Sequence, residues 1–252
     1  MSGHSHWHNI QLTKGKTDVK RAQMFSKFAK SIVVAARDGG GDPAYNFKLR
    51  MAVEAAKAVS MTRDNIDRAI QRGAGGGEGT GLKEAVYEGF GPGGVAFIVT
   101  CLTDNPTRTV ATVKHIASRN GGSIGASGSV AWMFQKKAVI IFDQSEHLIM
   151  DRDSFELAMI DAGADDIRHP LIEEEGNGEG VDIIQVIGEV KNFAKLMEAV
   201  EKMSLKLLAS SIEYIPKETT SVYDPEAKAQ TKALFEALEE NEDVDAVYTN
   251  EA

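Results

Sequence analysis

The apolar positions in the first third of the chain recur at helical spacing. Three amphipathic stretches are visible, each between residues that start or stop helices. The first expected helix begins at Phe25 and ends at Gly39. The second is capped by Asp42 and has Pro43 at its first position, and the third runs from a cap at Thr62 to a stop at Gly73. Residues 1–72 are therefore predicted to form a small three-helix domain with a leading arm.

The hydrophobic period changes after residues 73–81, whose sequence GAGGGEGTG has the composition of a flexible linker. Beyond it, apolar residues alternate or run continuously, which is typical of strands. The expected strands are 85–89, 95–102, 130–134, 138–142, 167–172, 181–187, 210–215 and 245–248. The expected helices are one capped by Asp104 or Asn105 that ends at Asn120, followed by 154–162, 190–203 and 225–240.

Short helices lead three times through a tight turn into a strand, which is the pattern of split βαβ units. The predicted fold class is α+β, with a basic N-terminal three-helix domain followed by two ferredoxin-like domains, one inserted in the other. The expected domains are residues 1–81, residues 82–134 plus 207–252, and the insertion 135–206.

Charge is distributed unevenly along the chain. The net charge is −9, but residues 1–81 carry 13 Lys/Arg and 7 Asp/Glu, a balance of +6 that leaves −15 for the remainder. A locally basic segment attracts phosphate within about a Debye length of ~8–10 Å. The alternative is a solvated charge run without function.

The residues expected to bind nucleic acid are concentrated in the arm and the first helix. Lysines there can neutralise phosphates, and Trp7 can stack on an unpaired base. A second basic face is expected on the helix after Pro106, where Arg108, Thr112, His115 and Arg119 share helical spacing. The full predicted set is Trp7, Lys14, Lys16, Lys20, Arg21, Lys27, Lys30, Arg108 and Arg119. A disordered tail and a solvated helix face are the alternatives.

Motifs that point to chemistry fail on their context. Gly89–Gly94 fits a dinucleotide pattern, but it lies between two expected strands, so a hairpin turn explains it. Gly121–Gly125 fits the hydrolase elbow around Ser123, but a helix precedes it and a strand follows, the reverse of what the elbow needs. Cys101 lies in an apolar run and is expected to be a core residue. His4, third from a start at Ser2, permits a copper or nickel site with little expected biological meaning.

Eight ordered segments of the chain resemble the YebC/PmpR family. They are GHSHWHNI (3–10), KTDVKR (16–21), AARDGGGDP (35–43), MTRDNIDRAIQRG (61–73), YEGFGPGG (87–94), TDNPTRT (103–109), NGGSIGASGSVAWMF (120–134) and EDVDAVYTN (242–250). The resemblance implies a non-enzymatic protein of three domains around a cleft, with a role in gene expression. It implies a DNA-binding transcriptional regulator in the family's usual assignment, and a ribosome-associated translation factor that contacts ribosomal RNA as the alternative.

Composition sets the remaining expectations. No run approaches the ~18 apolar residues of a membrane helix, so no membrane partner is expected. The single cysteine excludes an intrachain disulfide and favours a cytoplasmic location. No cofactor and no metal are expected. The expected partner is nucleic acid (DNA or ribosomal RNA), with the ribosome as a further possibility. The oligomeric state is left open.

Overall fold

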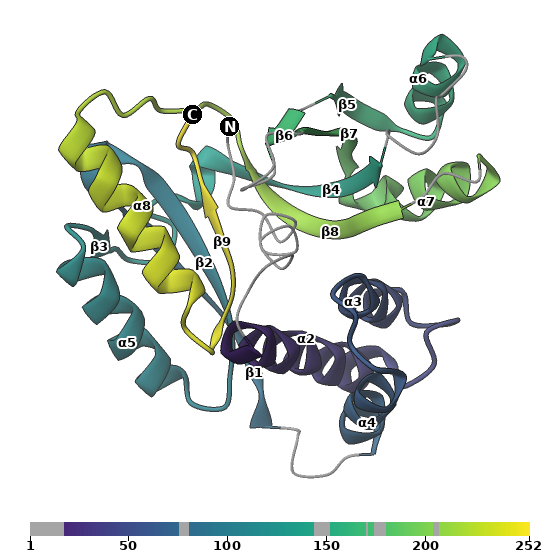
Figure 1. Ribbon diagram of the computed structural model, residues 1–252, viewed down its shortest axis with the longest axis horizontal. Coiled ribbons are helices and arrows are strands. Elements are labelled where there is room, and N and C mark those ends of the chain that lie inside the picture. The colour runs from purple at the N-terminus through teal and green to yellow at the C-terminus, as the bar shows by residue number, and fades with distance from the viewer. Residues whose placement is uncertain (1–17, 76–80, 144–151, 170, 174–179, 204–206) are drawn as a thin grey trace. The chain divides into compact units, whose positions relative to one another are not determined.

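The structure, a computed structural model, describes residues 18–75, 81–143, 152–169, 171–173, 180–203 and 207–252 (Figure 1). It divides into two compact units, and the second is inserted in the sequence of the first. Residues up to Gln135 together with Tyr214–Ala252 form the first unit, and Lys136–Glu213 form the second. N-terminal helices are followed by antiparallel sheets, so the predicted α+β class is confirmed.

Three helices open the first unit: α2 (Asp18–Gly39), α3 (Phe47–Ala58) and α4 (Arg63–Ala74). Helix α2 begins seven residues before the predicted Phe25. The predicted start of the second helix was wrong, because Asn46 rather than Asp42 is its N-cap and accepts from the Leu49 N–H at 3.1 Å. Asn46 is buried and also donates to the carbonyls of Ala35 and Gly40, so its local contacts fix where the helix starts.

Gly73 was predicted to stop the third helix, but it lies inside α4, which continues to Ala74. A Cβ at this position would lie 2.4 Å from the Val33 carbonyl oxygen of α2. Gly73 therefore allows two helix backbones to approach closely, and its role is packing rather than capping.

The first sheet has strand order β3-β1-β2-β9 and is antiparallel. Helices α5 and α8 cover one face, where Val113, Ala117, Leu234 and Phe235 pack on strand residues such as Phe97. The elements are β1 (Lys83–Phe90), β2 (Ala96–Thr103), α5 (Pro106–Arg119), β3 (Ser123–Ile124), α8 (Pro225–Glu239) and β9 (Val244–Thr249). Because β2 and β3 are both antiparallel to β1, which lies between them, β2-α5-β3 is a split βαβ unit as expected.

The glycine-rich motif at 89–94 forms the predicted hairpin turn between β1 and β2, with Gly93 at φ 70° and Gly94 at φ 77°. The predicted strand at 130–134 was wrong. Ala131–Met133 form a short 3₁₀ helix, and β4 (Phe134–Asp143) begins only at Phe134. Val130 and Phe134 pack with Ala96 and Ile98 on the sheet face away from α5 and α8.

Apart from the short β6, which pairs with β7, the second unit has a β-α-β-β-α-β order, with its strands arranged as β5-β7-β4-β8. This sequence and strand order are those of the ferredoxin-like arrangement expected for the insertion. Phe142 packs edge-on against Phe155 of α6, and Ile184 is buried. The elements are α6 (Arg152–Asp161), β5 (Ala164–Arg168), β6 (Leu171–Glu173), β7 (Gly180–Glu189), α7 (Phe193–Lys202) and β8 (Leu207–Pro216).

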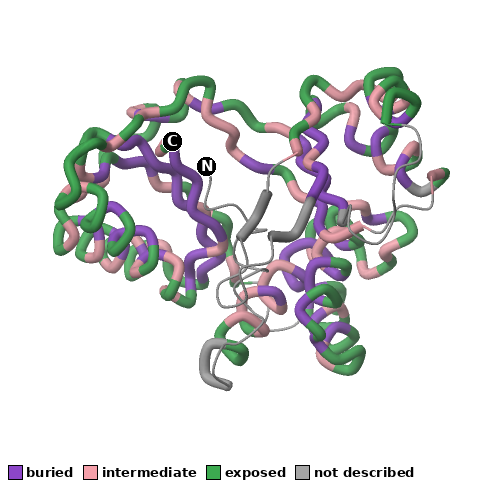
Figure 2. Tube along the Cα trace, turned by 45° about the horizontal axis from the view of Figure 1, so that its top comes forward, coloured by how far each residue is buried: buried purple, intermediate pink, exposed green. Residues whose placement is uncertain are grey.

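Most residues of β2 and β9 in the first sheet are buried, while the helices have exposed outer faces (Figure 2). Over the described ranges, no helix has both the length and the apolar character needed to cross a membrane.

Candidate nucleic-acid interface

The predicted binding residues fall into three groups in the structure. Trp7, Lys14 and Lys16 lie outside the described residues, as does the possible metal-binding start at His4. Lys20 lies in the first turn of α2. Arg21, one residue later, is exposed to solvent. The described part of the basic segment therefore begins on a helix.

Lys27 and Lys30 of α2 have partners inside the protein. Lys27 donates from Nζ to the backbone carbonyl of Glu239, the last residue of α8. Lys30 donates to the Glu242 carbonyl at 2.9 Å. Carbonyls at a helix C-terminus lack intrahelical donors and attract cations. Burial lowers the pKa of the Lys27 ammonium to about 8, although nearby Asp245 and Glu239 oppose this shift.

Asp243 joins elements that are far apart in the sequence. Lys30 of α2 donates to its Oδ1 at 2.9 Å, while Arg108 of α5 donates to Oδ2 at 3.0 Å and Thr109 does so at 2.9 Å. Burial alone would raise the pKa of Asp243, but these donors outweigh it and lower the pKa to about 2. The carboxylate, directly before β9, is therefore a charged junction between the middle of α2 and the start of α5.

Helix α5 carries the second predicted basic face. Its cap is Asn105, which accepts from the Arg108 N–H at 3.0 Å, so one of the two predicted caps is used. Arg108, His115 and Arg119 are exposed, and so is Lys114. The helix sequence PTRTVATVKHIASR contains no acidic residue. Beyond Arg108, its cations therefore present positive charge without a carboxylate from the same helix.

Asp243 is not among the site residues predicted from the sequence. The side chain is only 8% exposed, and its partners Lys30 and Arg108 lie 213 and 135 residues away. No local pattern announces such contacts. The one available signal was the excess of acidic residues directly before a predicted strand.

The residues considered as possible catalytic groups, Ser123 and Cys101, lie in an edge strand and in the hydrophobic core. Ser123 lies in the edge strand β3, where its backbone pairs with Phe90, after a helix rather than before one. Cys101 is buried in the first core, and burial raises the pKa of its thiol to about 12. A thiol that stays protonated at neutral pH is a poor nucleophile.

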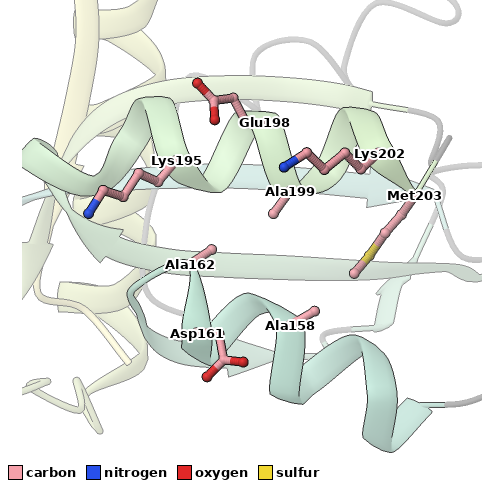
Figure 3. A pocket seen from close by; sticks show the side chains of 8 residues that line it. All are labelled: Ala158, Asp161, Ala162, Lys195, Glu198, Ala199, Lys202 and Met203. Atoms are coloured by element: carbon pink, nitrogen blue, oxygen red, sulfur yellow. The ribbon is translucent and has the colours of Figure 1, made fainter.

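A hollow of about 340 Å³ lies between α6 and α7 of the second unit (Figure 3). Alanine side chains and Met203 point into it, whereas the Glu198 carboxylate points away. The rim carries two lysines, Lys195 and Lys202, and two acids, Asp161 and Glu198. The hollow is therefore lined by charges of both signs.

Comparisons with known proteins match almost the whole chain. Residues 5–76 match the family model described as the TACO1/YebC protein N-terminal domain, and residues 82–251 match the model of the TACO1/YebC second and third domain. A crystal structure of a conserved hypothetical protein from Aquifex aeolicus superimposes with a TM-score of 0.81 at 36% identity, covering 95% of this chain and 93% of that one.

Curated relatives agree with the family models. A probable transcriptional regulatory protein of Persephonella marina is 42% identical over 250 residues, which are 99% of this chain and 95% of the relative. One of the same description from Thermoanaerobacter pseudethanolicus is 43% identical, over 99% and 96% of the two chains. The predicted resemblance is confirmed, and the chain belongs to the TACO1/YebC family of regulatory proteins.

Proposed function

We propose that this protein is a non-enzymatic regulator of gene expression that binds nucleic acid through its basic arm and the exposed face of α5. The names of its relatives support a regulatory role. The proposal includes a cytoplasmic location, which the single cysteine favours. In the usual assignment of the family, such a regulator is a DNA-binding transcriptional regulator.

The observation that carries the proposal is the junction at Asp243. It holds α2 and α5 together through Lys30 and Arg108. Helix α2 starts at Asp18, about 18 Å along the helix axis from Lys30. The segment with Lys14 and Lys16 thus joins the protein within a few helical turns of the α5 face, and one nucleic acid can contact both.

The structure changes which cations the proposal uses. Lys27 and Lys30 already donate to carbonyls and to Asp243, so their role in it is to dock α2. Phosphate contacts are assigned to Lys14, Lys16, Lys20 and Arg21 of the arm and helix start, and to Lys114 and Arg119 of α5. Arg108 is left out of this set because it pairs with Asp243 and Asp104.

A second candidate is a ribosome-associated translation factor that contacts ribosomal RNA. It is favoured by large aromatic side chains in solvent: Tyr45 is 90% exposed, Tyr223 91% and Trp132 67%. Exposed rings stack on unpaired bases, which structured RNA offers and duplex DNA does not.

Charge reversal on α5 tests the proposal. Lys114→Glu with Arg119→Glu should weaken binding to nucleic acid and make the log–log salt slope on duplex DNA shallower by about 2, because each phosphate contact contributes about 0.9. Lys228→Glu with Lys232→Glu on exposed α8 changes the charge equally and is the matched control. Equal losses in both double variants would show a general charge effect and contradict the assigned face.

Deletion of the arm is the second test. The deletion should stop before Asp18, because a start at Phe25 would also remove the first seven residues of α2. Fluorescence anisotropy with labelled duplex DNA and with ribosomal RNA fragments measures affinity. A truncated protein with unchanged melting temperature and unchanged affinity for both would remove the arm from the proposal.

A further inference from the structure

A loop between β3 and β4 is held against the first sheet by one buried carboxylate. Glu88 of β1 is 6% exposed and accepts backbone N–H groups of Gly128 at 2.7 Å, Val130 at 2.8 Å and Ala131 at 2.7 Å. Its own backbone carbonyl accepts from Gly125 at 2.8 Å. Residues 125–131 are therefore anchored to a central strand of the first sheet.

The anchoring carboxylate is charged at neutral pH. Burial would raise the pKa of Glu88, but the three backbone donors outweigh it and lower the pKa. Bonds from N–H groups to a carboxylate are about twice as strong as those between neutral groups. The backbone on either side of the loop is thus held in one conformation.

This fixed loop leads directly into an exposed indole. Trp132 is 67% exposed, and its Nε1–H donates to the Ser129 carbonyl at 3.1 Å. That bond restrains rotation of the ring, so its aromatic face is presented to solvent in a set orientation. A large apolar surface held rigidly in water is a feature of recognition sites rather than of cores.

The surroundings of the indole indicate the kind of partner. Gly125–Gly128, the exposed part of the loop, has only small side chains, and exposed Lys217 donates its backbone N–H to the Met133 carbonyl at 2.9 Å. These small side chains do not extend the indole into the contiguous apolar patch that a protein partner would need. A single planar base with a phosphate beside it fits one exposed ring next to a cation.

A second aromatic lies on the same face of β1. Phe90 is two residues after Glu88, so its side chain points to the same side of the sheet, and it is 39% exposed. This is the face opposite α5 and α8. Val130, Met133 and Phe134 pack on this face, but Phe90 remains partly exposed there. Exposed aromatic rings on a sheet face are how some RNA-binding modules stack bases.

We propose that Trp132, held by the Glu88-anchored loop, is a stacking site for an unpaired nucleobase. The inference rests on the proposed nucleic-acid binding and deepens it, since it adds a site that distinguishes single strands and RNA loops from duplex DNA. Glu88 acts as a positioning residue, and Trp132 makes the contact.

Intrinsic fluorescence tests the contact directly, because the chain has only two tryptophans. In a Trp7→Phe background, Trp132 is the sole indole. Titration with a labelled single-stranded uridine oligonucleotide should quench its emission in step with the anisotropy of the label, and a matched duplex should not. Binding by anisotropy without quenching would overturn the stacking site but leave the proposed function intact. No binding of any nucleic acid would instead overturn the proposed function, and the stacking site with it.

Substitutions measure the size and the specificity of the effect. Trp132→Ala should weaken single-strand binding about ten-fold or more and leave duplex affinity unchanged, while Trp132→Phe should retain most of it. Leu157→Ala, at a large apolar residue of α6 that is 62% exposed, is the control. Glu88→Gln should weaken single-strand binding while the circular dichroism spectrum stays native. Unchanged single-strand affinity in Trp132→Ala would refute the inference.

Discussion

Asp243 and Glu88 are both buried carboxylates of the first sheet domain, yet their partners differ in kind. Asp243 is held by side chains, with Lys30 and Arg108 as cations and Thr109 as a hydroxyl donor. Glu88 is held by backbone N–H groups of a single loop. The first joins three elements remote in sequence, whereas the second shapes one local segment.

The difference separates cations that are paired inside the protein from an aromatic side chain that is exposed to solvent. At Asp243, basic residues that looked available for phosphate are engaged inside the protein. At Glu88, no cation is used, and the result is an indole in solvent. A count of positive charges therefore overestimates the number of cations available for binding near Asp243, and it gives no sign of the exposed indole near Glu88.

The largest expected effect is the loss of the Asp243 junction. Asp243→Ala should destabilise the fold by about 3 kcal/mol, because it removes the buried carboxylate that Lys30, Arg108 and Thr109 share as an acceptor. Urea denaturation measures the free energy of unfolding. Asp104→Ala is the control, since Asp104 also pairs with Arg108 but is 66% exposed and should cost about 0.5 kcal/mol or less. Equal costs would mean that Asp243 is no more than a surface ion pair.

Acid should weaken the same junction. The pKa of Asp243 lies at about 2 in the folded state against an ordinary 3.8, so the unfolded state binds more protons between these values. Its contribution is complete above about pH 4 and is lost as the pH falls towards 2, a change of about 2 kcal/mol. The stability difference between the parent and Asp243→Asn, measured across this range, should shrink with falling pH. A constant difference would contradict the assigned ion pairs.

The loop carboxylate should matter less for stability. Glu88→Gln is expected to cost about 1–2 kcal/mol, because the amide keeps one acceptor oxygen but turns an NH₂ group towards backbone donors. Glu84→Gln, on the same strand but exposed, should cost much less. If thermal melts give the two variants the same melting temperature, then the loop is not held by Glu88.

The smallest effect is expected at the indole itself. Trp132→Ala should change the free energy of unfolding by about 0.5 kcal/mol or less, since most of the ring is already in solvent. A loss of several kcal/mol in denaturant titrations would make Trp132 a structural residue and remove the reason to expect a ligand there.

Elements with strong local signals were predicted well. The helix after Asn105 was expected to end at Asn120 and ends at Arg119. The Asn105 cap and Pro106 mark its start, and Gly121, at φ 75°, follows its end. The start of α3 was misplaced. Asp42 and Pro43 form a plausible local start, but Asn46 gains buried bonds to Ala35 and Gly40 that only the folded helix pair provides.

The sequence by itself determined the α+β class, the order of the elements and the basic character of the arm, because periodicity, capping and charge act between near neighbours. Tertiary structure decided which charges are occupied and which rings are exposed. Lys30 meets Asp243 across 213 residues, and Glu88 binds the backbone of the loop that precedes the exposed Trp132. Such contacts depend on chain segments brought together by the core, so no local pattern encodes them.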